Sequence, residues 1–392
     1  MQINLSELRI VPSLMMMVFA IQTAVDFNAI EMQRASYAML AMMLLAAMCS
    51  FFLIIRQRTI SLTDLLTMSF LLIVAVSSLF HGTDFVHWAY ICFGVCLLRF
   101  FFNFYQDRLT PLVVGLALGF SIAVLAQFYQ LVTHPELWFI PEGKEIKGYI
   151  LGGNYNQMGV RLLITLVLDI LCIKISRKFL LILVPCLVAC IAIPLMVGSM
   201  TAVTSIILFI LLCLIPFARL RRIGITALLV SIALFQILVC FTGKGIENNE
   251  FMVWFIEDVL GKDITFTYRT HMWDSSLRVI AESPLWGYGY PDPKWYVTQM
   301  TSFAVGPHNM LLGTLIFGGI IAFALYIYFL VVSLFRAFSI HDYWADGILT
   351  GISVLSLMML MEVYPIALVF TLFVLAEYYP KLHQQLSPTH EQ

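Results

Sequence analysis

The sequence contains very few charged side chains. Asp, Glu, Lys and Arg make up 11% of its residues, whereas a soluble globular domain carries about 25%. Hydrophobic residues make up 61%, and the mean hydropathy is +0.93. A chain so poor in charge cannot cover a water-facing surface, so its solvent must be lipid. The formal net charge of -1 also gives no field that would attract nucleic acid.

The sequence also lacks the cysteine patterns of disulfide frameworks and metal sites. All eight cysteines fall within apolar runs, where a small packing residue is the simplest interpretation. We therefore expect no metal and no cofactor. The first apolar run has no clear small-residue cleavage site after it, so it is predicted to be an uncleaved first span.

The apolar runs predict an all-α integral membrane protein with about 12 transmembrane helices, in one polytopic domain over residues 1–392. A spanning helix needs roughly 20 apolar residues. The predicted spans are Arg9–Ala24, Ser36–Ile55, Asp64–Phe80, Phe85–Phe102, Thr110–Val132, Met158–Ile175, Phe179–Val197, Ala202–Phe217, Ile223–Phe241, Asn309–Phe335, Gly347–Met361 and Ile366–Tyr379.

The positions of Lys and Arg predict the orientation of these spans. Positive residues concentrate in cytoplasmic loops. When all twelve spans are counted, most basic residues outside the long loop fall on one side, which places both termini in the cytoplasm. These residues are Arg56, Arg58, Arg108, Lys174, Arg177, Lys178, Arg219, Arg221, Arg222, Arg336 and Lys381.

One long loop, residues 242–308, is then predicted to lie on the outer side of the membrane. Four tryptophans and many other apolar residues make it too hydrophobic for disorder, so we expect it to fold back onto the bundle. Thr267 as N-cap and Pro284 as a stop predict a helix between them. The glycine- and aromatic-rich run 284–290 that follows is predicted to be a simple chain reversal.

His308-Asn309 stands where the chain re-enters the membrane. Taken alone, this histidine could cap a helix or lie at the interface. Arg269 and His308, however, bracket one folded loop at the outer membrane face, which indicates a functional site there.

These residues resemble the O-antigen ligase and O-antigen polymerase family of membrane glycosyltransferases. The similar motifs are Arg269-x-x-x-Trp273, Pro284-Leu-Trp-Gly287-x-Gly289, His308-Asn309, Gly318-Gly319-Ile320, the earlier Gly153-Asn154-Tyr155-Asn156-Gln157 and the late acidic Glu362. The resemblance implies a bacterial inner-membrane enzyme that transfers glycan from a polyprenyl diphosphate, such as undecaprenyl diphosphate, outside the cytoplasmic membrane. Implied partners are this lipid-linked donor, a lipid-linked glycan acceptor, membrane lipid, a flippase and a chain-length regulator.

The sequence departs from the family at Met200, where a basic residue is usual. Methionine cannot bind phosphate, so another residue must supply that contact or the contact is missing. Arg161 is the candidate, because an ionisable residue inside a span is a functional hypothesis by default. The alternative is that Arg161 extends to the outer interface, and the sequence favours neither.

The chemistry that the resemblance implies suits the predicted residues. The catalytic candidates are Arg269, whose planar guanidinium fits phosphate oxygens, and His308, whose imidazole could deprotonate the acceptor or contact the diphosphate. No paired carboxylates or metal-ligand cluster is evident in the loop, so we expect a metal-independent reaction. The candidate substrate-binding residues are Arg161, Asn156, Trp273, Asn309 and Glu362.

Three alternatives remain at this point. The polymerase is preferred to the ligase because ligases usually keep the basic residue that Met200 replaces. A polysaccharide or lipid transporter is the alternative from another class, but most span interiors lack charge and no clear internal repeat is present. A purely structural scaffold would not account for the folded loop.

Overall fold

The computed structural model describes residues 10–27, 30–57, 59–138, 148–152, 155–241, 250–254, 269–301 and 306–387. These residues form helices joined by turns, with one isolated β-bridge between Val25 and Leu151. The α-helices are α1 (Ile10–Ala24), α2 (Gln33–Gln57), α3 (Leu62–His81), α4 (Phe85–Phe104), α5 (Thr110–Thr133), α6 (Met158–Ile175), α7 (Leu180–Val197), α8 (Met200–Leu214), α9 (Ala218–Phe235), α10 (Glu250–Trp254), α11 (Arg269–Glu282), α12 (Pro293–Gln299), α13 (Met310–Phe338), α14 (Tyr343–Met359) and α15 (Ile366–Leu386).

Each of the twelve predicted spans overlaps one of these helices. Eight helices are long and apolar enough to cross a membrane, namely α2, α3, α4, α5, α7, α9, α13 and α15. Helices α1, α8 and α14 are apolar but shorter, and α6 carries Arg161, Asp169 and Lys174 in its 18 residues. The chain is therefore a polytopic all-α membrane protein, as its composition predicts. The cytoplasmic placement of both termini stays a prediction.

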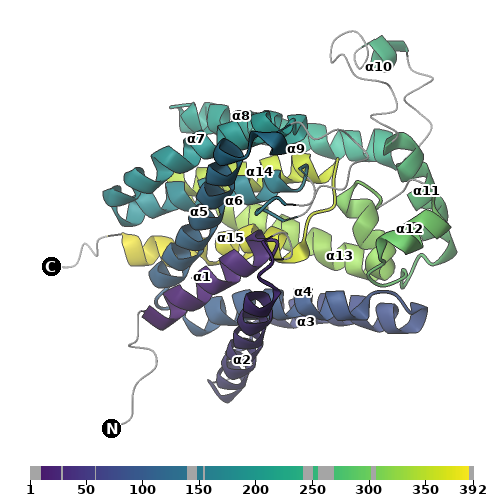
Figure 1. Cartoon of the computed structure of the whole chain (residues 1–392), viewed down its shortest axis with the longest axis horizontal. Helices are drawn as coiled ribbons and strands as arrows, with labels where there is room; N and C mark the ends of the chain where they lie inside the picture. Colours follow the sequence, from purple (N-terminus) through teal and green to yellow (C-terminus); the bar gives the residue numbers. More distant parts are fainter. Residues whose placement is uncertain are drawn as a thin grey trace.

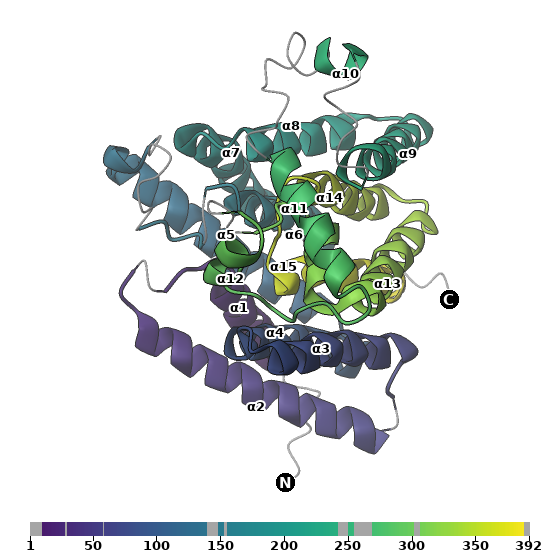
Figure 2. The ribbon, with the colours of Figure 1, turned by 90° about the vertical axis from the view of Figure 1, so that its right-hand side faces the viewer.

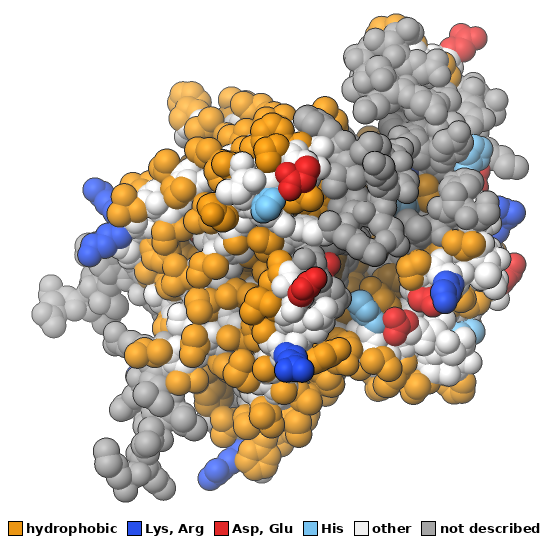
Figure 3. All heavy atoms as spheres, viewed as in Figure 1, with side chains coloured by type: hydrophobic (Ala, Val, Ile, Leu, Met, Phe, Trp, Pro, Cys, Tyr) orange, Lys and Arg blue, Asp and Glu red, His pale blue; other side chains and the backbone are white. Residues whose placement is uncertain are grey.

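Most of the long helices run side by side, whereas α2 crosses them at a steep angle (Figure 1). Helices α11 and α12 lie at one end of the bundle, and the last turn of α15 lies toward the other. Seen from the α11 end, α7, α8 and α9 lie along one side, α3 and α4 along the opposite side, and α6, α14 and α15 between them (Figure 2). Hydrophobic side chains cover most of the helix surface in Figure 3. Such a surface suits contact with lipid and would be unfavourable in water.

A buried charge cluster joins three of the helices. Arg99 of α4 is 2% exposed, its Nε lies 2.7 Å from Asp64 Oδ1 of α3, and its Nη2 donates to Glu377 Oε1 of α15 at 2.7 Å. Asn103 also donates to Asp64. Because a buried charge needs a partner, loss of one member typically costs about 3–5 kcal/mol. The cluster holds α3, α4 and α15 together.

A break in α13 receives the turn formed by residues 284–290. The α13 backbone leaves helical geometry at Gly318 and Gly319, where the φ of Gly319 is +61°. Three backbone hydrogen bonds join the turn to the break, from Tyr288 N to Ile316 O (2.7 Å), from Gly289 N to Phe317 O (2.9 Å) and from Ile320 N to Pro284 O (2.8 Å). Lipid could not satisfy these backbone groups, so the turn supplies what the broken helix needs. The run predicted to be a simple chain reversal is thus part of the bundle.

The same turn is also bound to the other side of the bundle. The Thr83 hydroxyl donates to Tyr288 O at 2.9 Å, and Tyr290 N donates to the Ser78 hydroxyl at 2.8 Å. Gly289 lies against α3 with a φ of +83°, and a Cβ there would lie 2.2 Å from the Ser78 Cα. Only glycine fits this close approach of two backbones.

We expect Gly289→Ala to lower the thermal stability of the purified protein by more than Gly82→Ala. Gly82 has a similar φ of +65°, but an added Cβ would meet nothing within 4 Å. The control therefore incurs only the backbone strain, about 1–2 kcal/mol, whereas Gly289→Ala adds a backbone clash. Equal melting temperatures for the two variants would contradict the described insertion of the turn.

Candidate active site

A cleft of about 280 Å³ lies at the α11–α12 end of the bundle. It brings together segments that are far apart in the sequence. The lining residues come from the start of α4, the entry to α6, the segment from the turn into α12, the segment before α13 and the connection between α14 and α15, and they include Asp84, Gln157, Tyr290, His308 and Glu362.

His308 and Glu362 form the polar centre of this cleft. His308 Nδ1 lies 3.3 Å from Glu362 Oε2, and the two side chains are 14% and 7% exposed. When Nδ1 carries a proton, it donates to the carboxylate, and Nε2 is left as an acceptor. This arrangement of an imidazole oriented by a carboxylate is typical of general bases.

The backbone of His308 is strained. Its φ is +46°, a left-handed conformation that is uncommon for residues other than glycine. Such strain costs about 1–3 kcal/mol and tends to occur at functional sites. The next residue, Asn309, is the N-cap of α13.

Helix α11 contacts the backbone of His308 through Trp273. Trp273 is 1% exposed, packs edge-on against Phe235 at 6.1 Å, and donates from Nε1 to His308 O at 3.5 Å. Arg269 lies one turn before Trp273, at the start of α11. Its Nε is buried and has no hydrogen-bond partner among the residues that the structure describes.

A second arginine and a tyrosine lie near the same place. Arg161 is 5% exposed, its Nη1 donates to Gln157 O at 2.8 Å, and its Nε has no partner in the described part of the chain. The Tyr364 hydroxyl is likewise buried and without a described partner. Burial raises the pKa of Tyr364, Glu362 raises it further, and Arg269 and Arg161 lower it.

Arg161 lies in the first turn of α6, and its side chain is buried. It is enclosed within the bundle, close to Gly152 and Tyr364. Met200, by contrast, is 59% exposed at the start of α8. Beside it, the Ser199 hydroxyl donates to Asn156 Oδ1 at 3.3 Å. Gly153 and Asn154 lie outside the described residues, as does Thr267.

Asn309 has a positioning task in the structure. It is fully buried and caps α13, since its Oδ1 accepts from Leu311 N at 3.0 Å and Leu312 N at 3.1 Å. Its Nδ2 donates to Gln236 Oε1 at 2.8 Å and to Leu360 O at 3.2 Å. These bonds connect the start of α13 to the end of α9 and to the segment that carries Glu362.

His308 thus contacts both Glu362 and Trp273. Asn309 holds the adjacent start of α13 to the segment that carries Glu362, and Arg269 and Arg161 both lower the pKa of Tyr364. Sequence reasoning missed Tyr364 and the cleft residues Asp84, His87 and Tyr290. Tyr364 follows Glu362 by two residues, which is a weak signal. The cleft residues gave no signal, because only the turn's insertion brings Tyr290 to His87, with ring centroids 5.3 Å apart.

Fold and cleft together define a multi-pass membrane protein with a polar site at one end of its bundle. Residues 184–327 match the family model described as O-antigen ligase. A stretch of 61 residues is 38% identical to an O-antigen ligase of Pseudomonas aeruginosa, and it covers 16% of this chain and 15% of that protein. The resemblance inferred from the motifs is confirmed, and the matched segment contains α11, the turn, His308 and the break in α13.

We expect Asn309→Ala to lower the melting temperature more than Asp292→Ala. Both side chains cap helices, but Asp292 is exposed and caps only the short α12. Loss of Asn309 removes a cap worth about 1 kcal/mol and leaves buried partners unsatisfied at about 1–3 kcal/mol. Similar shifts in a thermal unfolding assay in detergent would show that Asn309 is no more than a cap.

Proposed function

We propose that this chain is a metal-independent membrane glycosyltransferase that joins polyprenyl-diphosphate-linked oligosaccharide repeat units, as an O-antigen or capsule polysaccharide polymerase. The observation that carries the proposal is the His308–Glu362 pair beside three buried polar groups that lack described partners, on Arg161, Arg269 and Tyr364. Together they offer a base and an anion site at one end of a membrane bundle.

The two arginines and Tyr364 bind the diphosphate of the donor. A buried donor group without a partner is costly, about 1–3 kcal/mol, and is rare in native proteins. Phosphate oxygens would satisfy all three groups, and guanidinium binds phosphate with charge-assisted hydrogen bonds. The same contacts stabilise the negative charge that grows on the leaving diphosphate.

His308 activates the acceptor. The acceptor hydroxyl oxygen forms a bond to the anomeric carbon of the donor sugar, and its proton passes to His308 Nε2. The bond between that carbon and the diphosphate oxygen breaks, and the lipid diphosphate leaves with the electron pair. Glu362 stabilises the imidazolium that forms, as a carboxylate does beside a catalytic histidine.

The reaction takes place on the outer side of the bacterial inner membrane, facing the periplasm or the cell exterior. Positive-inside counting places residues 242–308 on that side, and the cleft is bounded by described parts of this segment. The lipid presents the donor from within the bilayer, so no nucleotide-sugar pocket is needed.

An O-antigen ligase, which moves finished glycan to lipid A-core, is the second candidate. Both comparisons favour it, since each carries the description O-antigen ligase. The preference for a polymerase depends on Met200, because ligases of the family usually have a basic residue at that position. A deletion strain separates the two: single repeats on the lipid core mean a lost polymerase, whereas naked core with long glycan on the carrier lipid means a lost ligase.

In that deletion strain, we expect Arg269→Ala and His308→Ala to fail to restore the glycan. Loss of one preorganised contact to the transition state typically lowers the rate about 100- to 1000-fold. Arg278→Ala is the matched control, because Arg278 is an exposed arginine on the same helix and donates only to Ser275 in the described structure. Near-normal glycan from both site variants, at normal membrane levels, would rule out the assigned site.

Tyr364→Phe separates a ligand contact from a structural role. The hydroxyl has no described partner, so its removal should leave the melting temperature unchanged. If it binds phosphate, transfer should fall about tenfold or more, as expected for a lost hydrogen bond to a charged group. A lower melting temperature with unchanged transfer would give Tyr364 a packing role instead.

A further inference from the structure

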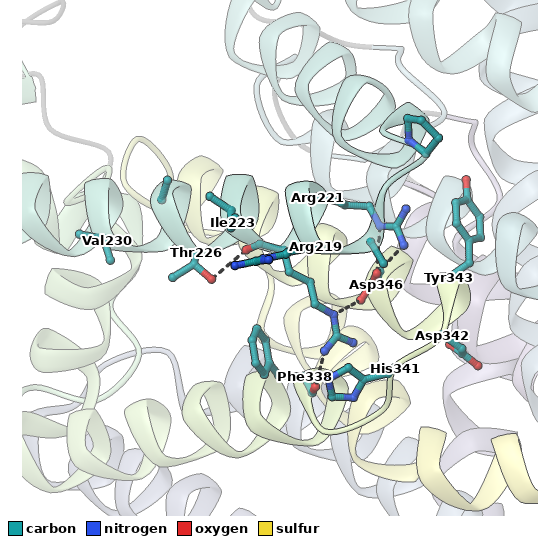
Figure 4. Close-up of a pocket in the computed structure, with 14 residues that line it drawn as sticks. Arg219, Arg221, Ile223, Thr226, Val230, Phe338, His341, Asp342, Tyr343 and Asp346 are labelled. Atoms are coloured by element: carbon teal, nitrogen blue, oxygen red, sulfur yellow. Dashed lines mark hydrogen bonds and ion pairs between the residues drawn. The ribbon is translucent and has the colours of Figure 1, made fainter.

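A second cavity lies at the other end of α13 from His308. It has a volume of about 890 Å³ and lies between the start of α9, the end of α13 and the start of α14 (Figure 4). Its walls are mostly apolar, and along α9 they are formed by Ile223, Ala227 and Val230. Ile223 and Val230 are 56% and 53% exposed, as expected for side chains that contact lipid tails.

Two arginines at this pocket have structural partners. Arg221 Nε and Arg222 Nε lie 2.9 Å and 2.7 Å from the two oxygens of Asp346. Arg221 also donates to Ile215 O at 2.8 Å, and Arg222 donates to Phe338 O at 3.0 Å. Two guanidinium groups thus share one carboxylate, which leaves an excess positive charge in the wall of the pocket.

Arg219 adds a third guanidinium at the same place. It is exposed and has no ion pair or hydrogen bond within the part of the chain that the structure describes, and the same holds for His341 on the opposite wall. Asp342, the other carboxylate in the lining, is occupied by Lys174 Nζ at 2.8 Å. The pocket is therefore lined by three guanidinium groups and a histidine, and the only carboxylate that pairs with any of them in the described structure is Asp346.

The position of the charge matches a lipid headgroup. The apolar span of α9 begins at Ala218, so Arg219 lies at the boundary of the hydrocarbon, where lipid phosphates are found. A phosphate can contact Arg219 and His341 while an acyl chain follows the apolar wall toward Val230. In Figure 4, Phe338 and His341 lie across the pocket from the α9 segment that carries Arg219.

We propose that this pocket is a binding site for one anionic phospholipid, held by Arg219 and His341 at its phosphate and by the α9 wall along its acyl chain. The site is independent of the proposed glycan transfer, because it lies at the far end of α13 from His308. A bound lipid would pack between α9 and the connection from α13 to α14, which Arg222 of α9 already joins by donating to Phe338 O and Ile340 O.

Native mass spectrometry of the full chain in detergent tests the site. We expect phosphatidylglycerol to be retained in preference to phosphatidylcholine, and Arg219→Gln to weaken its binding about fivefold, the effect of one basic residue at a lipid surface. Arg177→Gln is the control, since Arg177 is another exposed arginine of a short loop on the same predicted side. Equal retention of both lipids, or equal effects of the two variants, would overturn the proposal.

A second variant tests the acyl-chain wall. Ala227 is exposed in the pocket, so Ala227→Trp should fill the groove without disturbing the bundle and should weaken phosphatidylglycerol binding while all charges remain. Inorganic phosphate at millimolar concentration should not displace the lipid. Unchanged binding in Ala227→Trp, or full displacement by phosphate, would show an adventitious anion site without a lipid groove.

Discussion

The insertion of the 284–290 turn into the break of α13 holds the candidate site together. Its three backbone hydrogen bonds satisfy groups that a broken helix would otherwise expose at membrane depth. The same turn brings Tyr290 to α4 and forms one wall of the cleft. Helix α11 enters the turn directly, so the register of the turn also determines where Arg269 and Trp273 lie.

Some buried polar groups of this molecule are paired with each other, whereas others have no partner among the described residues. The charge clusters around Arg99 and Asp346 are paired, and they join helices. Around Tyr364, in contrast, three buried groups lack described partners while two of them carry positive charge. The unpartnered atoms of Arg161 and Arg269 lie on positively charged side chains, so an anionic ligand would satisfy them.

The sequence was sufficient to predict the helices and part of the candidate site. Lipid requires long apolar runs, so each run coincides with a helix, and Pro284 marks the end of α11 as a proline should. The break in α13 was not predicted, because Gly318-Gly319 reads as two small residues within one long apolar run. The contact of His308 with Glu362, 54 residues apart, and the role of Tyr364 depend on tertiary packing that no local pattern encodes.

The most direct test of the account is glycan transfer by the purified protein in detergent, supplied with a polyprenyl-diphosphate-linked oligosaccharide and EDTA, with no membrane and no ion gradient. We expect elongated or transferred glycan with release of the lipid diphosphate, and none with His308→Ala. Absence of any transfer by an intact protein, together with gradient-dependent movement of the lipid-linked oligosaccharide across vesicles, would contradict it and favour a transporter.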